Sequence, residues 1–325
     1  MVLTSIFRDL FRNRAHGKGS FLSVVVNFHN NRREARNTLH SLTREYQLDA
    51  QDIPYEVIAL DHGSTQPLTE ADVCSFGPQF QYRSVPTQSV SPVAAINEAC
   101  HQAAGEQLLI LIDGAHILTP GVLRLLREAF RRFQSPFVAT VPFHLGPKRQ
   151  NLSVEDGYNQ MVEDQLLEGS GWKKNGYKLY SASGAFADDS GGWYGQLFES
   201  GCFALHKADY LALGGFDERF QSRGGGLTNL DIFQRALMWE KLNYIVLLGE
   251  GTFHQVHGGV ATNAPMEQHP WNAFHEEFKQ IRGMNFIRVP RKPTLLGNVP
   301  IEALHFARFS RELGEKIWRR YPAVE

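Results

Sequence analysis

The carboxylate of Asp113 directly follows an unbroken apolar run, Leu108 to Ile112. A carboxylate at the carboxyl end of a buried strand lies where open α/β sheets bind their ligands. Its oxygen atoms suit a divalent cation such as Mg²⁺ or Mn²⁺, which can neutralise a diphosphate leaving group. Many enzymes with such a metal offer two carboxylates at this place, whereas here Ala115 stands two residues further on. The sequence therefore raises the question of where a second ligand comes from.

The elements that must position this carboxylate alternate along the first half of the chain. Apolar, β-branched runs predict strands over residues 21–28, 55–60, 80–85, 108–112 and 137–143. Helical patterns lie between them, over residues 32–44, 92–104 and 120–133. This alternation is typical of βαβ units and predicts an α/β protein with a largely parallel sheet. Asp61 ends the second strand as Asp113 ends the fourth, so we expect both at one edge of the sheet.

The second half of the chain predicts fewer strands. Strands are expected over residues 201–205 and 244–248, and helices over residues 207–213 and 231–241. Residues 169–195 are rich in glycine and carry several aromatic side chains, which is typical either of a mobile substrate loop or of a surface loop pinned to the core. Within this stretch, Trp193 and Tyr194 either stack on an acceptor or pack in the core.

The composition is that of an ordinary soluble protein. The chain has 325 residues, of which 42% are hydrophobic and 21% charged, and its net charge is −1, so no global field attracts nucleic acid and none is expected as a partner. Three cysteines without CxxC spacing indicate buried thiols in a reducing, cytoplasmic compartment. No apolar run reaches the ~18 residues of a membrane span. Residues 1–20 form a basic amphipathic segment, which either packs on the domain or lies on a membrane surface.

Four stretches together resemble a known family. They are SVVVNFHNN, VIALDHGST, SPVAAINEACHQAAGEQLLILIDG and ALGGFDERF. In kind and order they are similar to the motifs of family-2-like glycosyltransferases of the GT-A fold, across most of the chain. The resemblance implies a Rossmann-like, nucleotide-sugar-binding α/β fold with a mostly parallel mixed central sheet flanked by helices. We expect this domain over residues 21–265, after the segment 1–20, with a C-terminal helical extension over residues 266–325.

The resemblance also implies which residues hold the donor. Asn27, His29, Asp61, Asn97 and Asp113 match positions that contact the nucleotide or its phosphates. The sequence departs from the family pattern next to two of these residues. His62 replaces a second acidic residue, and Ile96 stands where arginine is common, so one phosphate contact of the family stays open here.

The resemblance supplies candidate ligands for the missing carboxylate. FHQVHGG follows the last strand, and a histidine in this place can complete the metal shell. Because Mn²⁺ accepts imidazole better than Mg²⁺ does, Asp113 with His254 or His257 forms a workable shell. Residues three apart on a strand face opposite sides, so only one of the two histidines is expected to point at the site. His116 is an alternative, as are purely structural roles for both histidines.

Several residues are candidates for the base that would take the proton of the acceptor hydroxyl. Counted back from Arg235, Asp231 falls on a later aspartate of the family motif and Asn229 on the position of the base. Asn229 cannot accept a proton at neutral pH. Asp231 is therefore expected either as the base or as the N-cap of its helix, and Glu199 and Asp217 are the other candidates. Retention and inversion of the anomeric carbon both stay open.

The resemblance thus predicts a metal-assisted glycosyltransferase that uses Mn²⁺ or Mg²⁺ and a UDP- or GDP-sugar. The acceptor would be a glycan or lipid-linked hydroxyl in bacterial surface polysaccharide synthesis, in the cytoplasm or at the inner face of the membrane. The alternative is a non-catalytic sugar-nucleotide-binding or scaffold protein, for which Ala115 and Asn229 would be marks of a degenerate site. A zinc hydrolase built on His254 and His257 is a third reading, but no further ligand has metalloprotease spacing.

Overall fold

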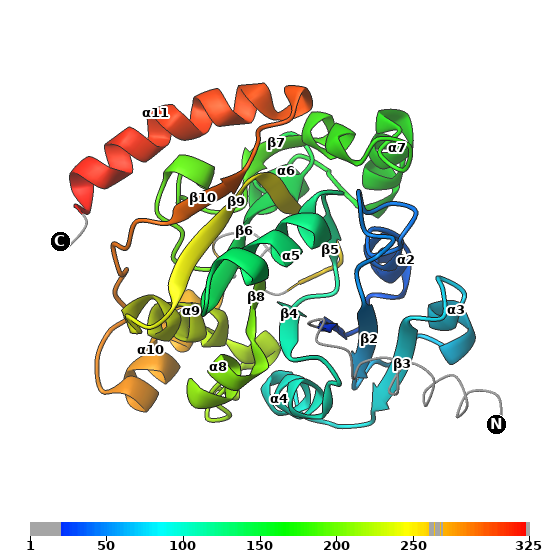
Figure 1. Ribbon diagram of the computed structural model, residues 1–325, viewed down its shortest axis with the longest axis horizontal. Helices are drawn as coiled ribbons and strands as arrows, with labels where there is room; N and C mark the ends of the chain where they lie inside the picture. The colour runs from blue at the N-terminus through cyan, green and yellow to red at the C-terminus, as the bar shows by residue number, and fades with distance from the viewer. Residues whose placement is uncertain (1–20, 260–262, 264–266, 268, 323–325) are drawn as a thin grey trace.

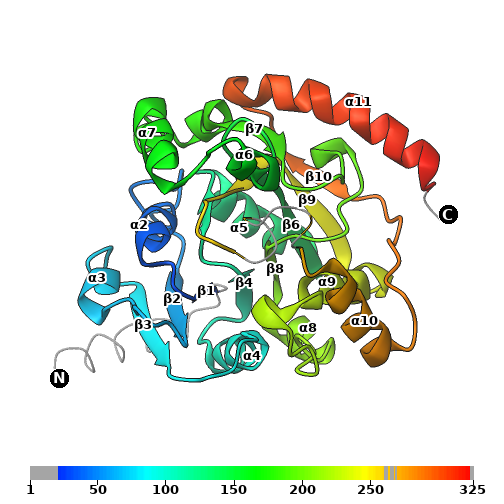
Figure 2. The ribbon, with the colours of Figure 1, turned by 180° about the vertical axis from the view of Figure 1, so that it is seen from behind.

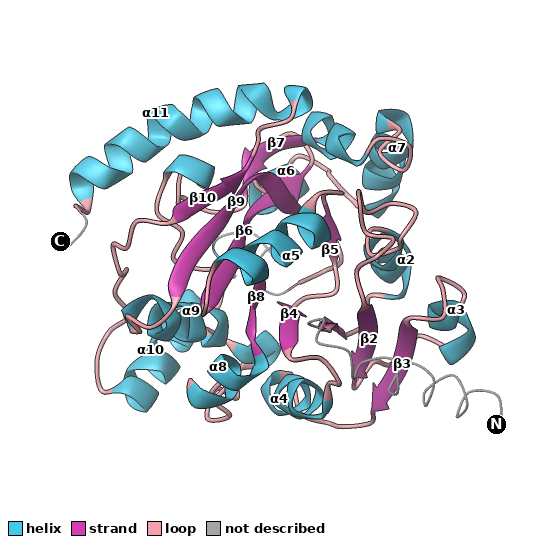
Figure 3. Ribbon diagram, viewed as in Figure 1, coloured by secondary structure: helices cyan, strands magenta, loops and turns pink. Residues whose placement is uncertain are grey.

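The computed structural model describes residues 21–259, 263, 267 and 269–322. Within them, ten strands form one sheet: β1 (Leu22–Phe28), β2 (Tyr55–His62), β3 (Phe80–Val85), β4 (Gln107–Leu111), β5 (His116–Leu118), β6 (Pro136–Leu145), β7 (Ser183–Phe186), β8 (Cys202–His206), β9 (Asn243–His254) and β10 (Thr294–Gly297). The strand order is β10-β9-β6-β8-β4-β1-β2-β3, with β5 paired to β9 and β7 to β6 (Figure 3).

Helices surround this sheet in both views of the ribbon (Figures 1 and 2). The longer ones are α2 (Arg32–His40), α4 (Val93–Gln102), α5 (Val122–Arg132), α7 (Gln160–Ser170), α9 (Thr228–Met238), α10 (Trp271–Arg282) and α11 (Leu304–Arg320). Shorter elements are α3 (Glu70–Cys74), α6 (Gln150–Glu155), α8 (Lys207–Ala212), η1 (Gly176–Ala182), η2 (Gly192–Tyr194), η3 (Arg223–Gly225) and η5 (Ile301–Ala303). None of the helices in these described residues is long and apolar enough to cross a membrane.

The sheet divides the core into two layers. Successive side chains of a strand point to opposite faces, and Val25, Ile58 and Ile110 accordingly join one buried cluster. Their neighbours Val24 and Val57 join the other. Burial on both faces explains why these strands read as continuous apolar runs. The predicted α/β fold with a mostly parallel mixed sheet and flanking helices is confirmed: β1 pairs in parallel with β2 and β4, whereas β8 runs antiparallel to β4.

The end of the described chain is tied to this sheet. The C-terminal segment was expected to be helical, and it supplies α10 and α11 but also β10, which pairs in parallel with β9. α11 lies along the top of Figure 1, close to η2. A Cβ on Gly314 would lie 2.4 Å from the carbonyl oxygen of Tyr194, so only glycine allows this approach. The amphipathic segment predicted over residues 1–20 lies outside the described residues.

Two smaller expectations are settled by burial. Trp193 is 1% exposed, and its Nε1 donates to the carbonyl of Glu250 at 2.9 Å, so this ring packs in the core instead of presenting a platform for an acceptor. Cys100 and Cys202 are buried free thiols as expected, whereas Cys74 is free but exposed.

Candidate active site

Asp113 sits in the tight turn that follows β4. Asn27 at the end of β1 donates through Nδ2 to the carbonyl of Ile112 at 3.2 Å, and Asp113 Oδ1 accepts the N–H of Ala115 at 2.9 Å. A Cβ on Gly114 would lie 2.2 Å from the ring of Phe28. Ala115 itself is completely buried. A carboxylate at position 115 would therefore be buried, and an unpaired buried carboxylate is unfavourable, which disfavours a second acidic ligand from this turn.

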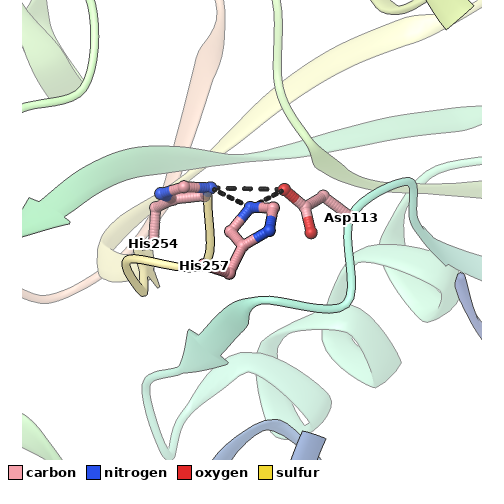
Figure 4. Close-up of side chains that lie close together, drawn as sticks. All are labelled: Asp113, His254 and His257. Atoms are coloured by element: carbon pink, nitrogen blue, oxygen red, sulfur yellow. Dashed lines mark hydrogen bonds and ion pairs between the residues drawn. The ribbon is translucent and has the colours of Figure 1, made fainter. Parts of the chain in front are cut away.

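Two histidines face the remaining oxygen of Asp113. His254 is the last residue of β9, and His257 follows after a turn. Asp113 Oδ2 lies 3.2 Å from His254 Nε2 and 3.3 Å from His257 Nε2, and the two Nε2 atoms are 3.2 Å apart (Figure 4). The expectation that only one histidine points at the site is wrong, because the strand ends at His254 and strand alternation no longer applies to His257.

Gln150 in α6 fixes the tautomer of His254. Its Nε2 donates to the carbonyl of His254 at 2.7 Å, so its Oε1 must accept from His254 Nδ1, at 2.6 Å. With the proton on Nδ1, Nε2 carries a lone pair. That lone pair faces the carboxylate of Asp113 and the ring nitrogen of His257. Three atoms of this kind repel one another unless a proton or a cation lies among them, so the residues present fit a metal ion.

The ionisation of Asp113 and His254 suits metal binding at neutral pH, whereas at His257 a cation competes with a proton. Burial alone would raise the pKa of Asp113, but the charge and hydrogen bonds of His257 and His254 outweigh it and hold the pKa well below its usual value. Burial lowers the pKa of His254 to about 4 despite the neighbouring Asp113. Burial would also lower the pKa of His257, but Asp113 raises it above the ordinary value. A cation would take over the role that a proton on His257 plays without it.

His116 serves a different purpose. Its Nδ1 lies 3.1 Å from the carbonyl oxygen of Asp113, and its ring packs edge-on against His254 at 4.9 Å between centroids. Among the described residues, the ligand atoms that lie within 4.8 Å of one another come from Asp113, His254 and His257. The alternative in which His116 replaces the second carboxylate is therefore not brought together by the fold.

The loop that carries His257 is held from two helices. Arg33 of α2 donates to the carbonyl of Val256 at 3.1 Å, while Glu163 of α7 accepts the N–H of Val256 at 2.9 Å. Arg33 and Glu163 also pair with each other at 3.0 Å. Both polar groups of one peptide residue are thus fixed by one ion pair directly before the ligand. Gln150, Arg33 and Glu163 belong to no motif, and no spacing in the sequence could have marked them.

Three of the residues that were expected to contact the nucleotide sugar lie at the ends of the neighbouring strands. Phe28 pairs with Asp61, and Val26 with Leu111, so Asn27, His29 and Asp61 lie along the same edge as Asp113. Asp61 is buried and its Oδ2 accepts the N–H of Leu68 at 2.8 Å. His29 Nδ1 lies 2.7 Å from the carbonyl oxygen of His62. Asn27 Oδ1 is buried without a partner among the described residues.

The side chain of Asn97, unlike a free polar group, is hydrogen-bonded within the protein. Its Nδ2 donates to the carbonyl of Phe216 at 2.8 Å, and its Oδ1 accepts the N–H of Phe216 and the hydroxyl of Tyr210. The side chain is therefore occupied in holding the Gly214–Gly215 turn. Asn97 thus fixes the backbone that leads to α9, and its contact with a nucleotide stays a prediction.

Asp231 is likewise occupied. α9 begins at Thr228 after the N-cap Leu227, so Asp231 lies in the first turn and is not an N-cap. Its carboxylate is completely buried and accepts from Arg235 Nε at 2.9 Å and from Arg282 Nη2 at 2.7 Å. Asn229, two residues before Asp231 on the same helix, donates through Nδ2 to Glu199 Oε2 at 3.2 Å. The fold thus separates Asp231 from Asn229 and brings Asn229 to a different carboxylate.

Sequence and structural relatives agree with this architecture. The model of glycosyl transferase family 2 matches residues 23–186, about half of the chain, and the protein belongs to that family. No curated protein sequence matches the chain.

Among solved structures, S. aureus TarS 1-349 in complex with UDP is similar with a TM-score of 0.50 and 17% identity, over 92% of this chain and 72% of that one. The complex of TarS 1-349 with UDP-GlcNAc matches with a TM-score of 0.50 and 16% identity over the same shares. At this identity the likeness establishes the fold alone, which is that of GT-A glycosyltransferases.

Proposed function

We propose that this protein transfers a sugar from a nucleotide sugar to an acceptor hydroxyl, with a divalent cation held by Asp113, His254 and His257. The observation that carries the proposal is the convergence of one carboxylate oxygen and two imidazole nitrogens within 3.3 Å. Two nitrogen ligands favour Mn²⁺ over Mg²⁺. The bound cation would neutralise charge on the diphosphate as the bond to the sugar breaks.

The strand ends beside the metal ligands support a nucleotide site. Asn27, His29 and Asp61 present polar groups at the same edge, where α/β sheets bind nucleotides. UDP is the first nucleotide to test, since the similar TarS structures hold UDP and UDP-GlcNAc. GDP is the alternative. In this proposal Asn27 and Asp61 orient the base and ribose, while the closed turn at Gly114 keeps Asp113 fixed against the diphosphate.

The proposed acceptor is a glycan or lipid-linked hydroxyl at the inner face of a bacterial membrane, in surface polysaccharide synthesis. The exposed side of α11 supports a peripheral contact. A groove along this helix is lined by basic side chains that include Arg308, Arg311 and Arg319. Leu304 and Phe309 on the same helix are 55% and 46% exposed. Basic groups interleaved with apolar ones are typical of interfacial helices.

The test is a thermal-shift titration with UDP and GDP, each with and without Mn²⁺. A ligand that binds the folded state raises its apparent stability, by about 2.7 kcal/mol at 100 times Kd. We expect a manganese-dependent shift with one nucleotide that is lost in Asp113→Ala and in His254→Ala. The matched control, His101→Ala, removes an exposed histidine on α4 and should leave the shift intact.

The remaining outcomes separate this proposal from its rival. A shift that needs no metal would contradict the proposed shell. Nucleotide binding without any turnover of the corresponding sugar donors would favour the non-catalytic binding protein. Ala115 does not itself support that rival, because the position is buried and, in this proposal, the two histidines take the role of the second carboxylate.

A further inference from the structure

Three carboxylates near the family's base position could take a proton from an acceptor, and two of them are neutralised by arginines. Asp231 accepts from Arg235 and Arg282. Asp217 pairs with Arg219 at 2.7 Å and with Arg282 at 3.0 Å, and these hydrogen bonds hold its pKa below the usual value despite partial burial. Both oxygens of each of these carboxylates already accept hydrogen bonds from arginine side chains or backbone N–H groups, so neither offers a free oxygen to an acceptor hydroxyl.

Glu199 differs from both. Its hydrogen bond partner in the described part of the chain is the neutral amide of Asn229, at 3.2 Å. No arginine or lysine among the described residues forms an ion pair with it. Burial, together with the nearby charge of Asp188, raises the pKa of Glu199 to about 7. A carboxyl group with such a pKa can accept and release a proton near neutral pH.

The sheet register brings Glu199 to the metal-ligand edge. β8 runs antiparallel to β4, with Cys202 opposite Leu111, and Ile112 N–H donates to the carbonyl of Gly201 at 3.1 Å. The segment before β8, which carries Glu199, therefore runs alongside the segment after β4, which carries Asp113. A Cβ on Gly201 would lie 3.6 Å from the ring of His116, so the two segments are in close contact.

Polar atoms around Glu199 lack partners. Asn229 Oδ1 and Asp188 Oδ2 are buried and have no hydrogen bond partner within residues 21–259, 263, 267 and 269–322. Buried polar atoms are rarely left unpaired, and an exception is typical of a functional site. Both atoms are acceptors, so the fold leaves hydrogen-bonding capacity unfilled beside Glu199. Glu199 itself is only partly buried, so a hydroxyl group of a ligand can reach it.

We propose that Glu199 is the catalytic residue that takes the proton of the acceptor hydroxyl, with Asn229 orienting its carboxylate; this rests on the transferase function proposed above. The acceptor O–H bond breaks and its proton goes to Glu199. The acceptor oxygen forms a bond to the anomeric carbon, and the bond from that carbon to the phosphate oxygen breaks, with its electron pair leaving on the nucleoside diphosphate. Glu199 then returns the proton to solvent.

The groups that face Glu199 define its pH behaviour. Asn229 lies on α9, Asp188 and Asp189 follow β7, and Arg288 lies between α10 and β10. Arg288 is itself bound to Asp189 at 2.7 Å. The surroundings are therefore acidic on balance, and a second carboxylate at position 229 would make them more so.

The test measures UDP release from UDP-GlcNAc with Mn²⁺ in the absence of any other acceptor, so that water is the acceptor, alongside UDP binding by thermal shift. If UDP-GlcNAc is not turned over, the same assay uses a panel of UDP- and GDP-sugars. We expect Glu199→Gln to keep UDP binding within about twofold and to lower release about 10²- to 10⁴-fold, the usual contribution of a general base. The control Glu240→Gln changes an exposed glutamate and should leave both unchanged.

A pH profile separates catalysis from a structural role. Wild-type release should rise through pH 7, and this limb should disappear in Glu199→Gln. In Asn229→Asp two carboxylates would share one proton, so the limb should move to higher pH. Unchanged release in Glu199→Gln, or a wild type that binds UDP but hydrolyses no donor, would overturn the inference while leaving nucleotide binding in place. A wild type that binds no nucleotide with Mn²⁺ would overturn the proposed function and the inference together.

Discussion

The candidate site combines one carboxylate, which follows β4, with two imidazoles at and after the end of β9. Position 115 is buried and its neighbour Gly114 is packed against Phe28, and Oδ1 of Asp113 already accepts the N–H of Ala115, so Oδ2 is the acidic oxygen that this turn offers to the histidines. His254 and His257 are the candidate nitrogen ligands in place of a second carboxylate. In the proposed site they would replace a hard oxygen by a softer nitrogen, which would favour Mn²⁺ among the divalent cations.

Gln150 should affect the affinity for a metal ion, although it is not itself one of the three candidate ligands. It holds both Nδ1 and the carbonyl of His254. Gln150→Leu keeps the buried volume but frees the imidazole to rotate and to change tautomer. We expect the affinity for Mn²⁺ to fall about 10- to 100-fold, the usual effect of removing such a partner.

Calorimetric titration of Mn²⁺ measures this, with thermal melting to verify that the variant is folded. Gln280→Leu alters an exposed glutamine on α10 and serves as the control. An unchanged affinity in Gln150→Leu would mean that the orientation of His254 is set by packing against His116 and His144.

How far the sequence predicts individual residues depends on what holds each one. Asp113 follows the apolar run of β4, which marks it directly, whereas His254 ends β9 six residues beyond the expected end of that strand, and the family motif marked the two histidines instead. The occupied state of Asn97 and Asp231 could not be read, because their partners Phe216 and Arg282 lie 119 and 51 residues away. A motif identifies a residue type, whereas its hydrogen bonds depend on tertiary contacts.

At the scale of elements, α2 and α7 act together on the loop after β9. The Arg33–Glu163 pair fixes both the N–H and the carbonyl of Val256. Glu163 is completely buried, and burial raises its pKa to about 7 although Arg33 and the N–H of Val256 oppose this. The position of the loop therefore depends on the ion pair between Arg33 and Glu163, and burying Glu163 without Arg33 would cost free energy of folding.

Arg33→Met should lower both stability and metal affinity. It leaves Glu163 buried without its cation, which typically costs about 3–5 kcal/mol. It also releases the carbonyl of Val256 next to His257. Urea unfolding measures the first effect and Mn²⁺ titration the second.

Arg36→Met, an exposed position on the same helix, is the control for Arg33→Met. A loss of stability with unchanged Mn²⁺ affinity in Arg33→Met would show that the loop is held without the ion pair.

Most of the longer strands were predictable to within a few residues, because β-branched runs such as that of β1 mark them directly. The short strands β5, β7 and β10 were not predicted, and β9 continues six residues beyond its expected end, to His254. The helices α6 and α7 were not predicted, since their few buried positions give no clear apolar stripe. α9 begins three residues before the expected start, at Thr228. That offset decides whether Asp231 is an N-cap, and no local signal distinguishes the two starts.

For the whole molecule, buried acids make stability depend on pH. Burial raises the pKa of Glu250 to about 7, although hydrogen bonds from Tyr177 and the N–H of Gly121 oppose it. A folded-state pKa above the unfolded one contributes stability that is complete below pH 4.5 and is lost as the pH rises through 7. For this group the loss is about 3 kcal/mol at most.

Glu250→Gln should therefore flatten the pH dependence. We expect the free energy of unfolding to fall from pH 5 to pH 8 in the wild type and to fall less in the variant, as measured by urea unfolding at both pH values. The difference between the two pH values is the readout, because glutamine also loses one acceptor and lowers stability at every pH. Equal falls in both proteins would show that Glu250 does not titrate in this range.

The ligands of the candidate metal site are far apart in the chain, with 141 residues separating Asp113 from His254. The ribosome adds about 5–20 residues per second, so roughly 7–30 s pass between the appearance of the first ligand and that of the second. During that interval β1 to β4 can already pair, because their residues are all present by Leu111. In the proposed site a cation can therefore gain its histidine ligands only after residue 254 has been synthesised, and a chain that stops before residue 254 would lack two of the three candidate ligands.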